Sequence, residues 1–252
     1  MNRFSCPWPV PHDPLRLTPG VVHVWCLPLD VTDAQIRALR HSLSHDERDR
    51  AARYHLDRHR RGFIACRGQV RRILAGYLND SAEQLRFRYG PLGKPALEVA
   101  GTDSAIQFNV SNSQAIALCA VTLNRELGVD VEHVQSPYDF DGLAQQFFAP
   151  TEVAQLYSLS EDQRFNAFFN CWTRKEAVLK AVGTGLTFPL DKVIVTLAPD
   201  EPARLVAFDD DPAAAESWWL THLDPIPGYV GALAVQGSRP EVLRWRFEMS
   251  RK

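Results

Sequence analysis

Three carboxylates and one lysine are spaced in the sequence so that they could hold a metal ion against a phosphate group. Asp130 and Glu132 lie two residues apart in the run GVDVEHV, which predicts a strand, so both side chains project from one of its faces. Glu176 and Lys180 lie four residues apart in a predicted helix over 162–182, where two side chains can meet. Mg²⁺ takes carboxylate oxygens and completes its octahedron with water and phosphate oxygens, and a lysine can neutralise the remaining phosphate charge. The four side chains therefore suit a magnesium–phosphate site.

The position of Glu176 on its helix calls for a partner outside the helix. At 100° per residue it falls in the middle of an apolar face, where an isolated ionised carboxylate is strongly unfavourable or stays protonated. Two simpler interpretations stay open: a buried Glu176–Lys180 ion pair, and solvated acids on an exposed strand for Asp130 and Glu132. The apolar residues that share the face of Glu176 are Phe165, Phe168, Phe169, Trp172 and Leu179.

A second signal is electrostatic. Between Arg37 and Arg72 there are 11 arginines against 4 acids in a chain whose net charge is −2. For Arg37 and Arg40 we expect a solvated helix face, but the remainder of the run is dense enough to suit a polyanionic ligand. That denser cluster consists of Arg48, Arg50, Arg53, Arg58, Arg60 and Arg61. Two histidine pairs at helical i,i+4 spacing, at 41/45 and 55/59, lack a third zinc ligand and are interpreted as surface residues.

The order of predicted elements indicates an α+β fold in two similar halves. In each half a long helical stretch, 46–78 or 162–182, leads to a strand pair, and a site between such halves would draw residues from both. We expect a Pro-rich N-terminal extension over 1–20, an N-terminal half over 21–125 and a C-terminal half over 126–252. The expected strands are 21–27, 106–110, 116–123, 128–134, 192–197, 218–223 and 229–235, with turn-rich chain over 87–105 and a short SNSQ turn after 110.

Composition narrows the class of protein. A chain of 252 residues can bury a sizeable core, and its near-neutral charge indicates neither nucleic acid nor a membrane as partner. Five widely spaced cysteines without a CxxC pair predict reduced thiols. The longest apolar run is too short to span a bilayer, and the N-terminus lacks the apolar core of a signal peptide, so we expect a cytoplasmic protein.

Four motifs together resemble those of the surfactin-type 4′-phosphopantetheinyl transferases. GVDVE, at 128–132, and WTRKEAVLKAVGTGL, at 172–186, resemble the two signature motifs of that family. GKP, at 93–95, and FNVSNS, at 108–113, are similar to the two motifs that precede them, and the similarity runs from about Val21 to Val235. The resemblance implies the 4′-phosphopantetheinyl transferase fold, with pseudo-twofold symmetry and the active site between the halves.

The same resemblance implies an activity and its participants. Such enzymes move the phosphopantetheine arm of coenzyme A onto a serine of an acyl or peptidyl carrier protein, in a magnesium-dependent reaction that leaves adenosine 3′,5′-bisphosphate. By position, Asp130, Glu132 and Glu176 would hold Mg²⁺, and Lys180 would contact the phosphates. The positions matched to coenzyme A are Arg50 near the 3′-phosphate, Gly93, Lys94 and Pro95 beside the adenine and ribose phosphate, and Ser111 on a phosphate.

The sequence departs from the family pattern at two places. Asn112 stands where the family usually has histidine, which removes a charge-assisted contact and should weaken coenzyme A binding by ~1–2 kcal/mol. In the arginine-rich stretch, Glu47 and Gly62 take positions that are often basic in relatives, for which Arg48, Arg58, Arg60 or Arg61 could compensate.

For the chemistry, Glu176 is our candidate general base, and a pure metal ligand is the alternative. Trp172 is expected to pack beneath the site, and the aromatic residues of 138–149 to pack in the core or contact the carrier. A metal-dependent nuclease and a non-catalytic binding module are the other interpretations; the nuclease is disfavoured because Glu176 and Lys180 lie four apart on a helix. We expect a self-sufficient monomer, while the carrier and its pathway are not specified by the sequence.

Overall fold

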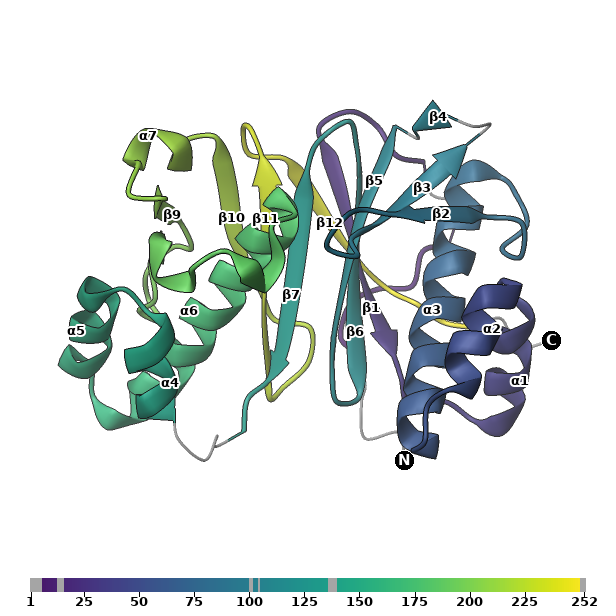
Figure 1. The fold of residues 1–252 in the computed structure, drawn as a ribbon, viewed down its shortest axis with the longest axis horizontal. Coiled ribbons are helices and arrows are strands. Elements are labelled where there is room, and N and C mark those ends of the chain that lie inside the picture. The colour runs from purple at the N-terminus through teal and green to yellow at the C-terminus, as the bar shows by residue number, and fades with distance from the viewer. Residues whose placement is uncertain (1–5, 13–15, 100–101, 104, 136–139, 250–252) are drawn as a thin grey trace.

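The computed structural model describes residues 6–12, 16–99, 102–103, 105–135 and 140–249, apart from the side chains at 99, 102, 103 and 186. Parts of the expected N-terminal extension and of the run 138–149 therefore lie outside the described residues. The fold is mixed α+β, as predicted, and its two lobes lie side by side (Figure 1). Within the described residues, no helix is both long and apolar enough to cross a lipid bilayer.

The first lobe is a mixed, mostly antiparallel sheet with helices packed against it. The helix α1 begins after Thr32, because Thr32 and Gln35 form a capping box. The predicted helix over 46–78 is divided into two helices, α2 and the long α3, which are separated by residues 53–56. The elements are β1 (Val21–Pro28), α1 (Asp33–His41), α2 (His45–Ala52), α3 (Asp57–Leu78), β2 (Arg86–Tyr89), β3 (Pro95–Val99), β4 (Thr102–Asp103), β5 (Ile106–Ser113) and β6 (Ile116–Leu123).

The second lobe repeats this plan around another long helix. The helix α6 ends at Gly183, whose φ of 83° gives the left-handed cap that the run GTGL predicts. The elements are β7 (Leu127–His133), α4 (Phe140–Phe147), α5 (Pro150–Ser158), α6 (Glu161–Val182), the 3₁₀ turns η1 (Gly185–Thr187) and η2 (Leu190–Lys192), β8 (Val193–Val195), β9 (Leu205–Phe208), α7 (Pro212–Ala215), β10 (Trp218–Leu223), β11 (Tyr229–Gln236) and β12 (Glu241–Arg246).

The two lobes share one strand order. In the first, β1 pairs with β6 and β6 with β5; in the second, β7 pairs with β11 and β11 with β10, and all four pairings are antiparallel. In each lobe the long helix, α3 or α6, precedes the last two of these strands. The matched order agrees with two similar halves, while a twofold axis between them stays a prediction.

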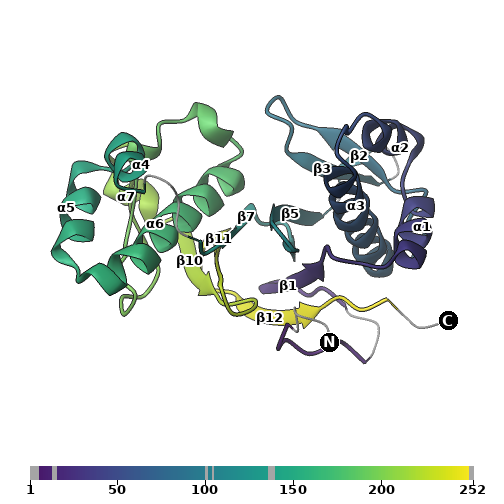
Figure 2. The same cartoon turned by 90° about the horizontal axis from the view of Figure 1, so that it is seen from below.

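Three features of the fold differ from the sequence-based expectations. The chain over 87–105 is not only turns, because β2, β3 and β4 form a small sheet. Ser111 and Asn112 lie on β5, which extends to Ser113, so they are strand residues and the turn is shorter than expected. Strand β12 lies parallel to β1 in the sheet of the first lobe (Figure 2). The last strand of the C-terminal half of the sequence therefore belongs to the first lobe.

A buried core joins the two lobes. Figure 2 shows β5 and β7 next to each other between the lobes, and these two strands are in contact. The core residues come from β1 and β6 on one side and from β7 and β11 on the other, so packing rather than a continuous hydrogen-bond ladder holds the lobes together. This junction core includes Val22, Val24, Cys26, Leu118, Val129, Val131, Tyr229 and Leu233, and Cys6 and Trp8 of the N-terminal segment complete it.

A glycine sets how closely β7 approaches α6. A Cβ atom at Gly128 would lie 2.1 Å from the carbonyl oxygen of Ala177 and 2.4 Å from the backbone nitrogen of Ala181. Both atoms belong to backbone, which cannot move aside as a side chain can. Strand and helix therefore touch backbone to backbone, at a distance that only glycine permits.

A buried histidine ties α3 to β1. The His23 side chain is 1% exposed, its Nδ1 lies 2.6 Å from the Tyr77 hydroxyl, and Trp25 Nε1 donates to the same hydroxyl at 2.9 Å. Burial lowers the pKa of His23 from 6.5 to about 4, because a buried imidazolium would lose its hydration. The folded protein therefore keeps this ring neutral.

The His23 ring should make stability depend on pH. Because its folded-state pKa of about 4 lies below its ordinary 6.5, the unfolded chain binds more protons between these values. The free energy of unfolding should thus fall as the pH drops from 6.5 towards 4, by up to ~1.4 kcal/mol per pH unit from this group. In urea unfolding at a series of pH values, His23→Asn should flatten the slope, whereas the exposed control His41→Asn should not. Equal slopes in all three proteins would contradict this role.

Adding one methyl group at Gly128 should separate β7 from α6. We expect Gly128→Ala to lower the free energy of unfolding by ~3 kcal/mol or more, because two backbone segments must move apart. Gly76→Ala is the matched control, since nothing lies within 4 Å of its added Cβ, and alanine should stabilise α3 by roughly 0.5–1 kcal/mol. Denaturant unfolding measures both, and similar values for the two variants would refute the close-approach argument.

Candidate active site

The strand β7 presents its acids and its apolar residues on opposite faces. Val129 and Val131 are 0% exposed in the junction core, as the alternation predicts. Asp130 is buried at 2% exposure and Glu132 is half-buried, and both point to the side where Ser111 and Ser113 of β5 meet them. The acids therefore lie at the junction of the lobes and not on a solvated strand face.

Lys180 connects α6 with both strands of the junction. Its Nζ lies 2.5 Å from Asp130 Oδ1 and donates to Ser111 Oγ at 2.9 Å, and Ser111 Oγ donates to the same carboxylate oxygen at 2.7 Å. Among the described residues, no hydrogen bond or ion pair joins Lys180 to Glu176. The Glu176–Lys180 ion pair left open above is therefore not formed, because the ammonium group of Lys180 pairs with Asp130 of β7.

Negative charge is crowded at this site. Burial, and then the neighbouring Asp130 carboxylate, raise the pKa of Glu132 to about 7, against the lowering effect of the Ser113 hydroxyl that donates to it at 2.9 Å. Burial and then Asp130 also raise the pKa of Glu176, although Lys180 opposes them. Three carboxylates thus face one ammonium group, and an additional cation would relieve their repulsion.

The donor atoms fit a magnesium ion that is completed by a ligand. Asp130 Oδ2 and Glu176 Oε1 are buried and accept no hydrogen bond within the part of the chain that the structure describes. In that same part, no group of three or more His, Cys, Asp or Glu side chains is arranged as a ready metal site. Mg²⁺ is usually held by one or two carboxylates together with water and substrate phosphates and not by an all-protein cage. The two free oxygens are therefore the right kind of donors for it.

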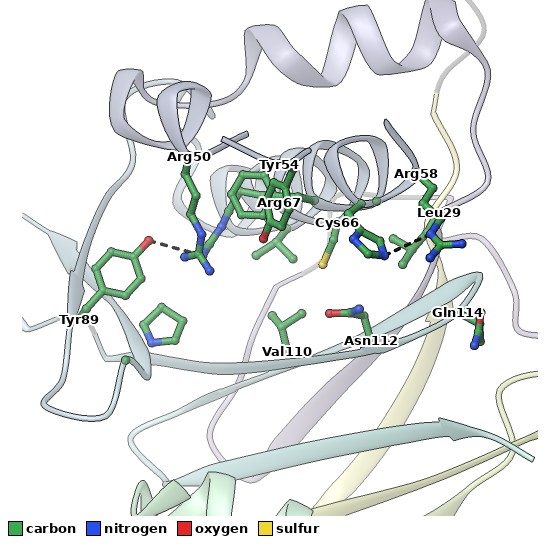
Figure 3. A pocket seen from close by; sticks show the side chains of 16 residues that line it. Leu29, Arg50, Tyr54, Arg58, Cys66, Arg67, Tyr89, Val110, Asn112 and Gln114 are labelled. Carbon is green, nitrogen blue, oxygen red and sulfur yellow. Dashed lines mark hydrogen bonds between the residues drawn. The ribbon is translucent and has the colours of Figure 1, made fainter. Parts of the chain in front are cut away.

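A basic cavity of about 860 Å³ lies on the other face of β5 (Figure 3). Val110, Asn112 and Gln114 of β5 and its turn form one wall, while Ser111 and Ser113 point to the acids. Helices α2 and α3 form the opposite wall, so β5 separates the cavity from the acid cluster by the thickness of one strand. The other lining residues are Leu29, Arg50, Tyr54, Arg58, His59, Gly62, Phe63, Cys66, Arg67, Val70, Tyr89, Gly93 and Pro95.

The cavity contains part of the predicted coenzyme A set. Arg50, Gly93, Pro95 and Asn112 line it, and Ser111 belongs to the acid cluster instead. Lys94 reaches into neither, because its Nζ donates to Glu126 at 2.8 Å and to the Ala181 carbonyl at 2.9 Å. In this structure Lys94 therefore ties the turn at 90–94 to the C-terminal end of α6.

Of the arginines considered as substitutes for missing basic positions, only Arg58 lines the cavity. Arg60 pairs with Asp57, and Arg61 pairs with Asp33 and donates to the Val31 carbonyl at 2.9 Å, so both stabilise the fold. Arg48 is exposed outside the cavity lining. The suggestion that Arg48, Arg60 or Arg61 compensates is thus not supported by their positions.

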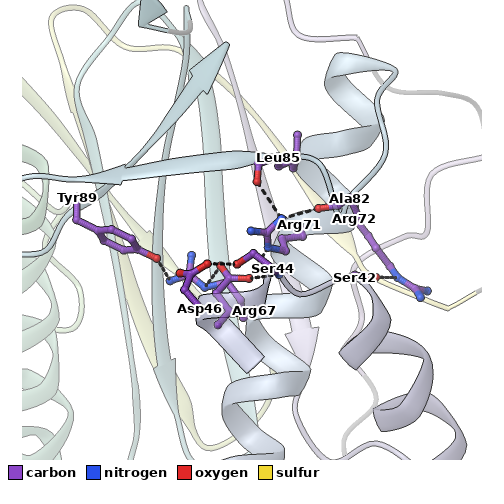
Figure 4. A network of polar contacts seen from close by, with 10 residues as sticks. Ser42, Ser44, Asp46, Arg67, Arg71, Arg72, Ala82, Leu85 and Tyr89 are labelled. Carbon is purple, nitrogen blue, oxygen red and sulfur yellow. Dashed lines mark hydrogen bonds and ion pairs between the residues drawn. The ribbon is translucent and has the colours of Figure 1, made fainter. Parts of the chain in front are cut away.

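Glu47 is buried in a polar network beside the cavity, and Figure 4 shows its partners Ser44, Arg67 and Arg71. It is 2% exposed, receives Arg71 Nε at 2.5 Å and the Ser44 backbone N–H at 3.1 Å, and lies 3.4 Å from Arg67 Nε. Arg71 also donates to the carbonyls of Ala82 and Leu85. This network fixes α2 on α3 and holds the guanidinium of Arg67 beside the cavity.

Several cavity residues were not singled out in the sequence. Arg67 donates to the Tyr89 hydroxyl at 3.4 Å, and the Arg50 guanidinium lies 5.2 Å from the centre of the Phe63 ring. These contacts hold two cations over the opening in fixed orientations. The sequence signal for them is that Tyr54, between α2 and α3, and Phe63, in α3, stand among the basic residues of the arginine-rich stretch.

The apolar face of α6 packs as the wheel predicts. Phe168, Phe169 and Leu179 are buried in the core of the second lobe. Trp172 stacks on Phe168 and meets the edge of Phe147, so it packs against the core of the second lobe, and its place beneath the site stays a prediction. In the run 138–149, Phe148 is 3% exposed, and Phe140 and Phe147 pack against the same core. These aromatic residues therefore pack α4 and Phe148 against α6 in the core of the second lobe.

Comparison with known proteins identifies the family. A profile of the 4′-phosphopantetheinyl transferase superfamily matches residues 126–234, which include β7, α6 and all three acids. The chain is 40% identical over 233 residues to the 4′-phosphopantetheinyl transferase HetI of Nostoc sp., covering 92% of this chain and 95% of that relative. It is 26% identical over 172 residues to the 4′-phosphopantetheinyl transferase Sfp of Bacillus subtilis, covering 68% and 71%. With acids, lysine and basic cavity arranged around β5, this chain belongs to the 4′-phosphopantetheinyl transferase superfamily.

Proposed function

We propose that the protein transfers the 4′-phosphopantetheine moiety of coenzyme A to a serine of an acyl or peptidyl carrier protein and releases adenosine 3′,5′-bisphosphate. The observation that carries the proposal is the pairing of the Lys180–Asp130–Ser111 cluster with a basic cavity across one strand. The pyrophosphate of coenzyme A needs cations where it reacts. The 3′-phosphate at the nucleotide end of the molecule needs further cations. Membership of the family favours this transfer over the nuclease and the binding module.

The cavity supplies charge and flat surfaces for the nucleotide end of coenzyme A. Arg50, Arg58 and Arg67 line it and would contact the 3′-phosphate. Tyr54 and Tyr89 offer aromatic faces to the adenine. Gly93, with a φ of 81°, leaves the backbone open to a close approach by the ligand. Asn112 would orient a phosphate through a neutral hydrogen bond.

At the reacting end, Asp130, Glu132 and Glu176 would hold Mg²⁺. When bound, the ion supplies Lewis-acid stabilisation of charge on the pyrophosphate. Lys180 is held between Asp130 and Ser111 and would stabilise the negative charge that the departing bisphosphate gains. Phosphoryl transfer depends mainly on such positioning and electrostatics, so no covalent protein intermediate is needed.

Glu176 would accept the proton of the carrier serine. Its Oε1 is buried without a hydrogen-bond partner among the described residues, and burial raises its pKa, both of which suit a general base. It comes from α6, across the junction from the acids of β7. A role as metal ligand alone is the alternative.

We further propose that the protein acts as a monomer, because the residues of the site come from both lobes of one chain. A cytoplasmic location stays a prediction from the sequence. A partner subunit is therefore not required to complete the acid cluster. The carrier domain of a synthase and a free carrier protein are equally compatible partners.

The proposed transfer has a direct test. Incubation with coenzyme A, Mg²⁺ and an apo-carrier protein should add the mass of one phosphopantetheine arm to the carrier, and chelation of Mg²⁺ should abolish the gain. Glu176→Gln keeps the shape of the side chain and should lower turnover at saturating Mg²⁺ by roughly 100-fold or more. Gln163→Glu is the control, because Gln163 lies in the first turn of the same helix, far from Glu176, and this variant should keep normal turnover. Near-normal turnover in Glu176→Gln would overturn both roles given to Glu176, and the absence of any mass gain with several carriers would overturn the function.

Restoring a basic group at position 112 should tighten coenzyme A binding. Asn112 lines the cavity, and Asn112→His would add a charge-assisted contact where the ring is protonated, worth ~1–2 kcal/mol. The Kd for coenzyme A, measured by calorimetry at pH 6, should fall by roughly 5- to 30-fold, with a smaller gain at pH 8. Asn112→Gln keeps a neutral amide and should show no such pH-dependent gain. An unchanged Kd in Asn112→His would show that this wall does not contact a phosphate.

A further inference from the structure

The N-terminal segment 6–12 is fastened to the last strand of the chain. The Arg246 backbone N–H donates to the Pro9 carbonyl at 2.8 Å, and Arg246 Nη1 donates to the Cys6 carbonyl at 3.3 Å. The Arg244 guanidinium also lies 6.0 Å from the centre of the Trp8 ring. These contacts place the segment over the junction core, of which Cys6 and Trp8 are members.

The same contacts bring two cysteines together. Cys26 of β1 is the register partner of Arg246 in β12, and the side chain of Arg246 in turn holds Cys6. Both cysteines belong to the junction core. Cys6 is 5% and Cys26 1% exposed, and both line a cavity of about 310 Å³ together with Arg246. An oxidant of a few atoms can therefore reach the pair.

The two thiols are not equivalent. The neighbouring Cys26 side chain and the nearby Arg246 cation lower the pKa of Cys6, whereas the Cys6 side chain and burial raise the pKa of Cys26. The other cysteines lack such an activated arrangement; burial raises the pKa of Cys66 to about 11 and that of Cys171 well above its ordinary value. Cys6 is thus the better nucleophile, and Cys26 is the thiol that would attack Cys6 once Cys6 is oxidised.

We propose that Cys6 and Cys26 form a reactive dithiol, closed by peroxides to a disulfide that fixes the N-terminal segment to β1. The Cys6 thiolate attacks one peroxide oxygen, the O–O bond breaks, and one water leaves while Cys6 becomes a sulfenic acid. The Cys26 sulfur then attacks the Cys6 sulfur, the S–O bond breaks, and a second water leaves. Two thiols are oxidised to one disulfide, and hydrogen peroxide is reduced to two waters.

This site is independent of the proposed transfer reaction. The segment that it fastens covers the core between the lobes, and a covalent link there limits the freedom of the unfolded chain without touching the acids or the basic cavity. Oxidation should therefore appear first as a change in stability. A thiol reductant should reverse it.

The experiment treats the folded full-length protein with hydrogen peroxide, blocks the remaining thiols by alkylation, and maps the peptides by mass spectrometry. We expect a loss of two hydrogen masses and a linked tryptic pair, residues 4–16 joined to 17–37, that dithiothreitol releases. The oxidised protein should melt higher by roughly 5 °C or more. In the Cys26→Ser variant the linked pair should vanish and dimedone should trap Cys6, whereas Cys66→Ala should leave the linked pair intact.

Two results would overturn the proposal. One is the absence of the 6–26 link in oxidised wild-type protein, which needs no variant to fold. The other is a 6–26 link that forms equally fast in guanidinium chloride, because its formation would then reflect chain proximity and not the folded geometry. Carrier modification in the same samples is measured separately, so failure of the disulfide and failure of the transfer activity are distinguishable.

Discussion

The missing side chain at Gly128 is the constraint on which the site depends. It lets the backbone of β7 rest on the backbone of α6, and the carboxylate of Asp130 then lies within reach of the ammonium of Lys180. With the two elements further apart, each carboxylate would be solvated and the charges would act separately. Gly231, on the neighbouring strand β11, is similarly crowded, since an added Cβ would lie 2.9 Å from the Asp130 carbonyl oxygen. Two glycines thus position one acid.

Close packing has an electrostatic cost, and the protein offsets only part of it. Lys180 neutralises Asp130, while Glu132 and Glu176 have raised pKa values because burial and Asp130 disfavour their ionised forms. The fold itself is held by other buried charges that are fully paired. Lys175, 0% exposed, lies 2.6 Å from Glu152 and donates to the Leu190 carbonyl, which fastens α6 to α5 and η2. This ion pair stabilises the second lobe, whereas Glu132 and Glu176 form no ion pair with any described residue.

Local patterns predicted most elements and failed where distant segments decide the structure. The strand at 218–223 and the alternation of β7 follow directly from residue type. The run SNSQ predicts a turn that includes Ser111 and Asn112, whereas both residues are in a strand because they pair with β6. The partner of Lys180 is 50 residues away in sequence, and no helical spacing rule includes such a contact. Likewise, the sequence alone does not show that Glu47 is the buried partner of Arg71, which lies 24 residues further along the chain.

The parallel pairing of β12 with β1 has a consequence for how the chain can be made and divided. The first lobe needs a strand that begins at Glu241, so its sheet cannot be completed on the ribosome until residue 246 has been synthesised. Before then, the outer edge of β1 presents unpaired backbone groups that could join another chain. A gene split at the apparent boundary near residue 125 would leave that edge bare in one fragment and strand β12 without its partner in the other. Evolutionary fission of this protein into two separate subunits would therefore require the C-terminal strand to be exchanged between them.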